Sequence, residues 1–297
     1  MLLNSVLKVS DMMIYVCADD YGMSRQTCGR IADCVKNGAL NKISIFPNSP
    51  MADIKEYIPG DGVTYGAHIN LVEGRPVSDP KDVFLLTDSR GYFKYSFSGL
   101  LALSLSPERK EFKRQIYTEI KNQLIRWKEI VPTDAAVIDS HQHTHMIPAV
   151  FECMMRVIKN ENIGVRYIRI PSEPIMPYLR AAELYGTYRP VNIAKQWILK
   201  FFAMVNGGVL KKSGIKSALF MGVMFSGNMD EQRVPRIFEE YKKLAEKKKC
   251  DIEILFHPGY VNRGEPVMDG KKTGFNKFYY SKYRRTEFDT LKKIEIK

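Results

Sequence analysis

The sequence predicts an α/β fold in which parallel strands alternate with helices along the whole chain. Three observations indicate this class. Seven short apolar, β-branched or aromatic runs are distributed along the sequence, helical patterns lie between them, and the length of 297 residues suits a single α/β barrel. Strand–helix alternation of this kind is typical of a parallel sheet, which is either open or closed into a barrel.

The seven runs are expected to be strands, and several are apolar throughout, as strands covered on both faces should be. In chain order they are MIYVCA (13–18), KISIF (42–46), VTYGAHI (63–69), AAVID (135–139), GVRYIRI (164–170), SALFMG (217–222) and DIEILF (251–256). The clearest helix is expected over 108–131, where Phe112, Ile116 and Ile120 begin an apolar series at three- and four-residue steps. Further helices are expected over 24–38, 148–161, 190–205 and 230–248.

We expect residues 1–297 to form one domain, because no internal repeat, low-complexity tract or Pro/Gly-rich linker divides the chain. Residues 1–12 are expected to be a ragged N-terminal extension. Residues 74–107 are too long for a simple connection, and long loops in compact domains are usually functional or disordered. Because this insertion follows the candidate ligand His68, we expect it near the active site, where its aromatics over 92–97 either stack on substrate or anchor the loop.

The composition argues against several classes of protein. No apolar stretch approaches the roughly 18 residues of a membrane span, and the first residues lack the features of a signal peptide, so we expect no membrane partner. The five cysteines form no C-x-x-C pair, which argues against a disulfide framework or a structural zinc site and favours the cytoplasm. The net charge of +12 is concentrated over 242–250 and 271–285 without a nucleic-acid-binding motif, so no nucleic acid is expected.

All five histidines of the chain lie at or just after the C-terminal end of an expected strand. The first strand ends in CADDYG, which adds Asp19 and Asp20. In parallel α/β sheets the C-terminal ends of the strands form the face that binds ligands. We therefore expect these side chains to meet at one active-site mouth. The histidines are His68, His141, His143, His145 and His257.

Imidazole and carboxylate together bind a divalent ion such as zinc, and a catalytic site keeps one position open for water. The stretch IDSHQHTHM (138–146) leaves two local geometries open. An extended chain places its three histidines on one side, with one of them a ligand and two supporting it. If the strand ends at Asp139, the stretch turns into a loop or a helix start, and His141 and His145 share one helical face. For Asp19 and Asp20 we expect divided roles, one toward the metal and one toward its water, since a cation relieves the repulsion between adjacent carboxylates.

At these residues the sequence resembles the YdjC-like carbohydrate deacetylases, a family that includes chitooligosaccharide deacetylase. The matching stretches, in the family's order, are ADDYGMS (18–24), GAHINLVEGRPV (66–77), IDSHQHTHMIP (138–148), EILFHPGY (253–260) and, more weakly, SKYRRTEFDTL (281–291). The resemblance implies a distorted (β/α) barrel with about seven parallel strands, related to the polysaccharide deacetylases. It also implies metal-dependent removal of an N-acetyl group from a small oligosaccharide such as chitobiose, giving free amino sugar and acetate.

Carried over by motif position, the resemblance implies that Asp20, His68 and His141 bind one divalent metal ion. Magnesium and zinc are the expected ions, with manganese or cobalt as alternatives. The resemblance also implies that Asp19 is the general base and that His257 protonates the leaving amine. Two residues near these motifs depart from the family pattern: cysteine replaces the usual asparagine at position 17, and tyrosine replaces phenylalanine at position 21.

Other residues are expected to support the site. His143 and His145 would orient the ligands or hydrogen-bond the substrate. Arg284 stands three residues before Glu287, the spacing of a salt-bridged helix pair, and a substrate contact is its alternative role. Glu73, after the strand of His68, is expected to be a loop residue.

Three other functions remain as alternatives. A phosphoesterase on the same scaffold would need ligands for a second ion, and the chain has few histidines left to supply them. A sugar- or metal-binding protein without catalysis could dispense with Asp19 and His257, so their presence favours an enzyme. An iron oxygenase built on two histidines and one carboxylate is a further alternative. The oligomeric state is left open, a homodimer included.

Overall fold

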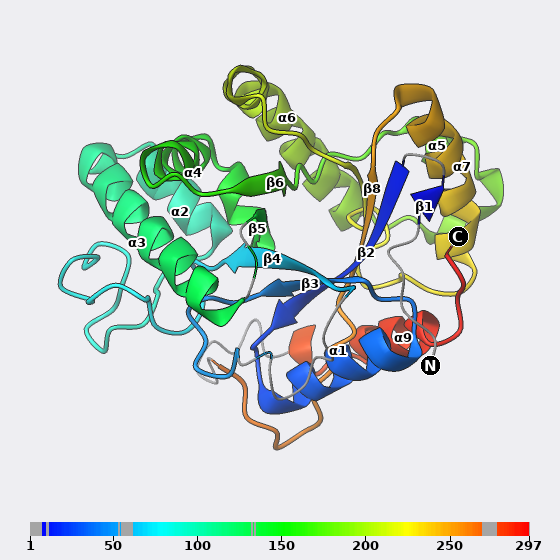
Figure 1. Cartoon of the computed structure of the whole chain (residues 1–297), viewed down its shortest axis with the longest axis horizontal. Helices are drawn as coiled ribbons and strands as arrows, with labels where there is room; N and C mark the ends of the chain where they lie inside the picture. The colour runs from blue at the N-terminus through cyan, green and yellow to red at the C-terminus, as the bar shows by residue number, and fades with distance from the viewer. Residues whose placement is uncertain are drawn as a thin grey trace.

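The centre of the molecule is a parallel sheet that curls into a half-barrel (Figure 1). The computed structural model describes residues 8–9, 12–52, 54, 62–131, 133, 135–268 and 278–296. Within these residues the strand order is β6-β5-β4-β3-β2-β8-β7, and β1 pairs antiparallel with β2 outside this path. The strands are β1 (Lys8–Val9), β2 (Met12–Tyr21), β3 (Lys42–Ile45), β4 (Thr64–Ile69), β5 (Ala136–Ser140), β6 (Val165–Ile168), β7 (Leu219–Met221) and β8 (Ile252–Phe256).

The barrel is incomplete between β6 and β7. Strands β2 to β8 run parallel to their neighbours in the path, and β6 and β7 are its two ends, with no ladder between them in the described part of the chain. There the N–H of Ile168 donates to the carbonyl of Lys216 at 3.1 Å. Seven parallel strands with this incomplete closure confirm the expected distorted (β/α) barrel.

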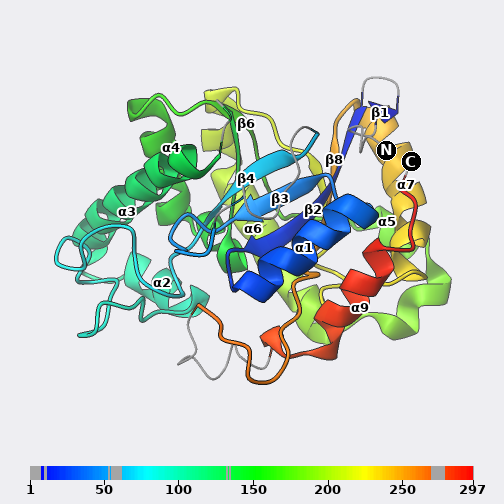
Figure 2. The ribbon, with the colours of Figure 1, turned by 60° about the horizontal axis from the view of Figure 1, so that its bottom comes forward.

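Helices surround the curled sheet (Figures 1 and 2). Helix α1 packs on β2, α3 packs on β4 and α4, α7 packs on β8, and α9 lies beside α1. The longer helices are α1 (Arg25–Asn37), α3 (Arg109–Ile130), α4 (Pro148–Asn160), α6 (Pro190–Ser213), α7 (Arg233–Lys248) and α9 (Lys282–Leu291). The shorter ones are α2 (Phe97–Ser104), α5 (Met176–Leu179), η1 (His141–Met146) and η2 (Ala182–Thr187).

Local signals in the sequence explain several helix boundaries. Ser24 caps α1, because its hydroxyl accepts the backbone N–H of Thr27 at 3.0 Å. Proline occupies the first position of α4 and of α6, where its missing N–H has no intrahelical partner to lose. Helix α6 ends at Gly214, whose φ of 70° is readily adopted by glycine. Among the described helices, none combines the length and the apolar character that a membrane span requires.

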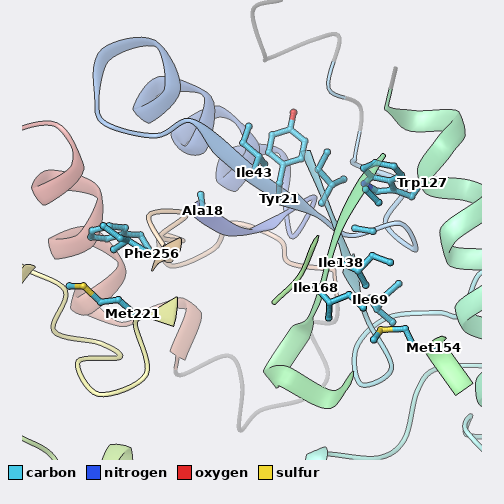
Figure 3. Packing of buried hydrophobic residues seen from close by; sticks show 14 of the residues in the cluster. Ala18, Tyr21, Ile43, Ile69, Trp127, Ile138, Met154, Ile168, Met221 and Phe256 are labelled. Carbon is cyan, nitrogen blue, oxygen red and sulfur yellow. The ribbon is translucent and has the colours of Figure 1, made fainter. Parts of the chain in front are cut away.

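The two faces of the sheet differ in polarity, because successive side chains of a strand point to opposite faces. The residues facing the helices are apolar, and Figure 3 shows Ala18, Ile43 and Ile138 among them. The concave face is apolar at its base, where Tyr15 and Tyr167 pack with Val137, and on the side of β7 and β8, where Phe220 and Leu255 pack with α6. Above this base it carries buried polar side chains: Cys17, Asp19, Lys42, Ser44, His68, Asp139, Arg169 and Glu253.

The structure differs from the sequence expectation in three segments. Helix α6 continues to Ser213, eight residues beyond the expected end. The insertion 74–107 contains α2 and an antiparallel bridge between Thr87 and Phe93. Of the expected N-terminal extension, Lys8–Val9 forms β1 against Met12 and Met13, and residues 1–7 and 10–11 lie outside the described residues.

Candidate active site

The C-terminal ends of the parallel strands surround a cavity of about 310 Å³. This volume is at the lower end of the ~300–1,000 Å³ that is typical of small-molecule sites. Residues at the ends of β2, β4, β5, β7 and β8 form its wall, together with Lys195 of α6 and Tyr279 before α9. Six of the expected site residues line it: Asp19, Asp20, His68, His141, His143 and His257.

The end of β2 explains how two consecutive aspartates face one cavity. Asp20 has a left-handed backbone with a φ of 68°, and the register with β3 shifts between Ala18 and Tyr21. A bulge of this kind re-aims a side chain, so Asp19 and Asp20 both line the cavity. A non-glycine residue in this conformation costs of order 1–3 kcal/mol, and such strain clusters at functional sites.

Asp20, His68 and His141 bring one oxygen and two nitrogens into a compact group. The Asp20 Oδ1 atom lies 3.0 Å from Nδ1 of His141 and 3.5 Å from Nε2 of His68. The three potential ligand atoms lie within 4.8 Å of one another. One carboxylate and two imidazoles form a donor set that suits zinc and other divalent ions. The structure therefore brings together the three residues expected to be metal ligands.

Two of these atoms, Oδ1 of Asp20 and Nε2 of His68, are buried and have no hydrogen-bond partner among the described residues. The other atom of each group is engaged: Oδ2 of Asp20 accepts from the Arg284 guanidinium, and Nδ1 of His68 lies 2.6 Å from Oδ1 of Asp139. Burying a polar atom without a partner is costly. A bound cation would satisfy both atoms, so these residues fit a divalent ion.

Asp139 fixes the ring of His68. Its carboxylate accepts the Nδ1 proton, which leaves the lone pair of Nε2 on the side of Asp20. Burial by itself lowers the pKa of His68, but the carboxylates of Asp19, Asp139 and Asp20 raise that pKa to about 10. A histidine with so high a pKa lies in a strongly negative potential, which favours a bound cation.

A second group of potential ligands comprises Asp19, His68 and Asp139. Protein cations already occupy it. The Asp139 Oδ2 atom lies 3.1 Å from both the Lys42 ammonium and the Arg169 guanidinium, and Asp19 also pairs with Arg169. The group of Asp20, His68 and His141 is therefore the better position for a metal ion.

Glu73 and Tyr279 hold the ring of His141. Its Nε2 atom lies 3.3 Å from Glu73 and 3.4 Å from the hydroxyl of Tyr279, which donates to Glu73 at 2.6 Å. A proton on Nε2 leaves the lone pair on Nδ1, the nitrogen nearer Asp20. Burial lowers the pKa of His141, but Glu73 and Asp20 outweigh it and the pKa is raised. Glu73 lies in a loop, as expected, but it is buried, with 1% of its surface exposed, and it supports the site.

Arg169 holds Asp19 in its charged form. Its two terminal nitrogens lie 2.7 Å and 2.9 Å from the two oxygens of Asp19. Burial alone would raise the pKa of Asp19, but Arg169 and His68 hold it below its usual range. The thiol of Cys17 lies 3.5 Å from Asp19 and 3.2 Å from Arg169. Burial raises the pKa of this thiol strongly, so Cys17 is a neutral neighbour of Asp19.

A layer of buried charges lies beneath the cavity and was not expected from the sequence. The Lys42 ammonium lies 2.7 Å from Glu253, and Arg169 lies 2.6 Å from the same oxygen. Asp139 completes the layer, so two cations face two carboxylates. Charged residues within otherwise apolar strands, such as Lys42 in KISIF and Glu253 in DIEILF, are the sequence signal for this layer.

Helix α9 supplies two supporting side chains, and they do not form the expected pair with each other. The Arg284 guanidinium contacts Asp20, and its other nitrogen donates to the carbonyl of Gly259 at 3.2 Å. The Glu287 carboxylate accepts the backbone N–H of His257 and lies 3.7 Å from its Nδ1 atom. The expected Arg284–Glu287 salt bridge is therefore replaced by two contacts to the site, because the buried face of α9 turns one side chain toward the end of β2 and the other toward the end of β8.

The three histidines after β5 have three different positions. Residues 141–146 form a short 3₁₀ segment with left-handed conformations at Gln142 and His143. The chain therefore turns after β5, as the second expected geometry has it, but the kink keeps this stretch from being one regular helical face. His141 joins Asp20, and His143 lines the cavity. His145 lies deeper, with Nδ1 2.6 Å from the Ser140 hydroxyl and Nε2 2.8 Å from the carbonyl of Arg169.

The insertion 74–107 lies beside the site through α2, which packs on η1. The residues that line the cavity come from other segments. Phe93 is buried in the main hydrophobic core, and Phe97 packs against Phe202 of α6. Of the two alternatives for the aromatics over 92–97, these two rings anchor the segment.

The model of the YdjC-like protein family matches residues 13–297. A carbohydrate deacetylase from Danio rerio is 25% identical over 309 residues, covering 94% of this chain and 91% of that protein. One from Clostridium beijerinckii is 29% identical over 285 residues, covering 95% and 93%. One from Thermoanaerobacter pseudethanolicus is 32% identical over 167 residues, and this match spans 55% of the chain and 63% of that protein.

The curled sheet also occurs in a crystal structure from Enterococcus faecalis V583, of a protein provisionally described as a cellobiose-phosphate cleavage protein. The TM-score is 0.62, with 94% of this chain and 90% of that chain covered at 17% sequence identity. At this identity the likeness shows the fold alone. The family model, in contrast, covers almost the whole chain and all the residues of the cavity. As the motifs indicated, the chain belongs to the YdjC-like family.

Proposed function

We propose that this protein hydrolyses the acetamide group of a small N-acetylated oligosaccharide such as chitobiose, giving the free amino sugar and acetate. The proposal rests mainly on the buried group of Asp20, His68 and His141, which shares one cavity with a carboxylate and a histidine placed for proton transfer. The near-full-length relatives named carbohydrate deacetylase support an amide hydrolase acting on a sugar.

In this proposal Asp20, His68 and His141 hold one divalent ion. When bound, such an ion polarises the acetyl carbonyl as a Lewis acid and lowers the pKa of water from 15.7 to about 7 in favourable cases. The chain contributes a rigid ligand set, because Asp139 orients His68 and Glu73 orients His141. Ligand orientation of this kind typically changes metal affinity or activity by about 10–100-fold.

Asp19 is the proposed general base. Arg169 keeps its carboxylate ionised, the form that can take a proton from the attacking water. Asp19 neighbours Asp20 in the chain and lines the same cavity, so the base lies next to the proposed metal position. The two carboxylates thus have different partners, a guanidinium deep in the barrel for Asp19 and Arg284 for Asp20.

His257 is the proposed general acid. An amide nitrogen is a poor leaving group unless it is protonated, and positioned acid–base groups contribute about 10²–10⁴-fold to such reactions. Glu287 holds the backbone of His257 and lies near Nδ1, which leaves Nε2 as the ring atom available to the sugar nitrogen. His143, which also lines the cavity and is kept neutral by burial and nearby cations, is available to hydrogen-bond the substrate.

The proposal is tested by measuring acetate release from di-N-acetylchitobiose and its longer oligomers. The protein is first treated with a chelator, and divalent ions are then added back one at a time. We expect release to return with metal, and Asp19→Asn and His257→Ala to reduce it by about 10²–10⁴-fold while metal binding remains. The exposed Asp33→Asn variant of α1 serves as the matched control and should retain full activity.

Two results would contradict the proposal in different ways. A protein that binds no divalent ion would remove its central element. Stoichiometric metal binding without acetate release from any sugar would leave the metal site in place and exclude these substrates.

A further inference from the structure

Helix α6 exposes its apolar side chains and buries polar ones, the reverse of an ordinary amphipathic helix. Its buried face includes three amides, Asn192, Gln196 and Asn206, together with Leu199 and Phe202. Its other face carries seven large apolar residues that are 41–68% exposed. This α6 apolar face consists of Val191, Trp197, Ile198, Phe201, Met204, Val205 and Val209.

Hydrogen bonds from the amides hold α6 on the barrel. Asn192 donates to the carbonyls of Met224 and Ser226 at 3.1 Å, and Gln196 donates to the carbonyl of Glu173 at 2.8 Å. Asn206 donates to the carbonyl of Met146 at 2.9 Å. These hydrogen bonds, with the packing of Leu199 and Phe202, hold α6 by its buried face and leave much of the α6 apolar face exposed. A contiguous exposed apolar face of this kind usually marks an interaction surface.

The charges of α6 are all positive. Its 24 residues include Lys195, Lys200, Lys211 and Lys212 and no aspartate or glutamate. The Lys200 ammonium lies 5.1 Å from the centre of the Trp197 ring, at the edge of the apolar face. Trp and Phe on one side with lysines beside them are typical of helices that lie at a lipid interface.

The same charges disfavour a second copy of this chain as the partner. In a two-fold dimer the same surface faces itself. Because Lys200 lies near the middle of α6, a two-fold pairing of the helices would bring it close to its own copy, and α6 offers no carboxylate to compensate. The net charge of +12 adds repulsion between copies and attraction to an anionic surface.

We propose that the α6 apolar face docks this protein on the surface of an anionic lipid bilayer. The helix lies in the interface rather than across it, so the absence of a spanning segment in the described helices does not oppose this binding. Helix α6 lies at the top of Figure 1, and the side chains of its apolar face are 41–68% exposed. From the sequence no membrane partner is expected, because it shows no spanning or signal segment and part of its excess positive charge is explained by a solvated, lysine-rich helix end.

Docking through α6 would hold the cavity near the membrane surface, because Lys195, on the barrel side of this helix, lines the cavity wall. An acetylated sugar carried on a lipid would then meet the cavity at the membrane surface. This consequence rests on the proposed deacetylase function, whereas the docking itself does not.

Co-sedimentation of the full chain with vesicles tests the docking. One set of vesicles contains equal amounts of phosphatidylcholine and phosphatidylglycerol, and the other contains phosphatidylcholine alone. We expect binding to the anionic vesicles, weaker binding at high salt and little binding to the neutral ones. Phe201→Ser should lower the vesicle partition coefficient about tenfold, since a buried phenyl ring contributes strongly to apolar transfer. Lys200→Glu should weaken binding to the anionic vesicles only.

Two matched variants control for general loss of apolar surface or charge. Phe84 is 57% exposed, against 56% for Phe201, so Phe84→Ser removes a similar exposed ring from another surface. Lys128→Glu reverses the charge of an exposed lysine on α3, just as Lys200→Glu reverses a charge on α6. Both should bind vesicles as the wild type does, and Phe201→Ser should still release acetate from a soluble substrate if the proposed function holds.

Failure of the wild type to bind anionic vesicles would overturn the docking proposal, as would equal losses in the control variants. A dimer that dissociates in Phe201→Ser would also overturn it and assign the α6 apolar face to a second copy. None of these outcomes depends on deacetylase activity, so failure of one proposal is distinguishable from failure of the other.

Discussion

The three histidines that follow β5 show how partners decide what an imidazole can do. His141 lies between Glu73 and Asp20, and these carboxylates raise its pKa despite burial. Burial and the charge of Lys195 hold the pKa of His143 well below its usual range. Burial also lowers the pKa of His145 to about 4. One short motif thus supplies one imidazole in negative surroundings that suit a cation and two that stay neutral.

His145 predicts a loss of stability in mild acid. Its pKa is about 4 in the folded protein and about 6.5 when unfolded, so the unfolded chain binds the proton more tightly. The neutral ring therefore contributes fully to the free energy of unfolding above about pH 6.5. This contribution falls by about 2–3 kcal/mol as the pH is lowered toward 4. Urea unfolding at neutral and acidic pH should therefore show a smaller acid-induced loss in His145→Gln than in wild type. Equal losses in the two proteins would contradict this account.

Much of the site could be predicted residue by residue, but its supporting contacts could not. Asp20, His68 and His257 follow apolar strands, and parallel topology alone brings such residues to one edge. Their partners come from distant parts of the chain: Arg169 reaches Asp19 across 150 positions, and Arg284 reaches Asp20 across 264. No local pattern encodes such pairings, since they depend on which strands become neighbours.

At the scale of elements, each strand separates an apolar layer from a polar one. In β4, Ala67 and Ile69 face the helices, whereas Gly66 and His68 face the concave side. Gly66 lies close to the buried charge layer, since a Cβ there would stand 2.8 Å from the Ser44 hydroxyl and 3.4 Å from both Asp139 and Lys42. A glycine at this point is what lets β4 pass next to that layer.

Gly66→Ala is expected to lower the free energy of unfolding by about 1–3 kcal/mol, the usual cost of overpacking. The Ser44 hydroxyl cannot move aside without losing its 2.6 Å hydrogen bond to Asp139.

Gly29→Ala is the matched control, because Gly29 lies inside α1 and a Cβ there meets no described atom within 4 Å. Alanine should raise the free energy of unfolding there by about 0.5–1 kcal/mol. Chemical denaturation measures both, and a Gly66→Ala protein as stable as the wild type would refute the packing argument.

The elements that the sequence did not predict share a physical cause. Periodicity marks a helix by its buried apolar face, but the apolar side chains of α6 are exposed, and Gly207 and Gly208 resemble a helix end, so the last turns to Ser213 were missed. Helix α2 has the nearly uniform apolar sequence FSGLLALS, in which no face is distinct. The left-handed residues of η1, Gln142 and His143, belong to no periodic pattern and carry no glycine to mark them. The seven strands could be recognised because the residues that face the helices are buried and apolar. This burial is visible in the sequence as short apolar runs.

At the scale of the whole molecule, elements from early and late in the chain meet beside the site. Helix α9 packs on α1, and the N–H of Ala39 donates to the carbonyl of Leu291 at 2.9 Å. This contact carries Arg284 to the end of β2, where burial would raise the pKa of Asp20 but Arg284 and His141 hold it well below its usual range. Asp20 therefore has a protein cation on one oxygen and the proposed metal position on the other.

This shared carboxylate predicts that Arg284→Gln makes folding depend on metal. Removing one partner of a buried ion pair typically costs about 3–5 kcal/mol, because the other charge is left uncompensated. A bound divalent ion can compensate Asp20 and meets less repulsion once Arg284 is gone, so metal should stabilise the variant more than the wild type. Thermal unfolding with metal and with chelator should therefore show a wider gap in melting temperature for Arg284→Gln than for the wild type.

The control is Arg285→Gln. Arg285 is exposed and lies over the Tyr260 ring, so this variant should keep the wild-type gap. Equal gaps in all three proteins would mean that Arg284 and the metal position do not share the charge of Asp20.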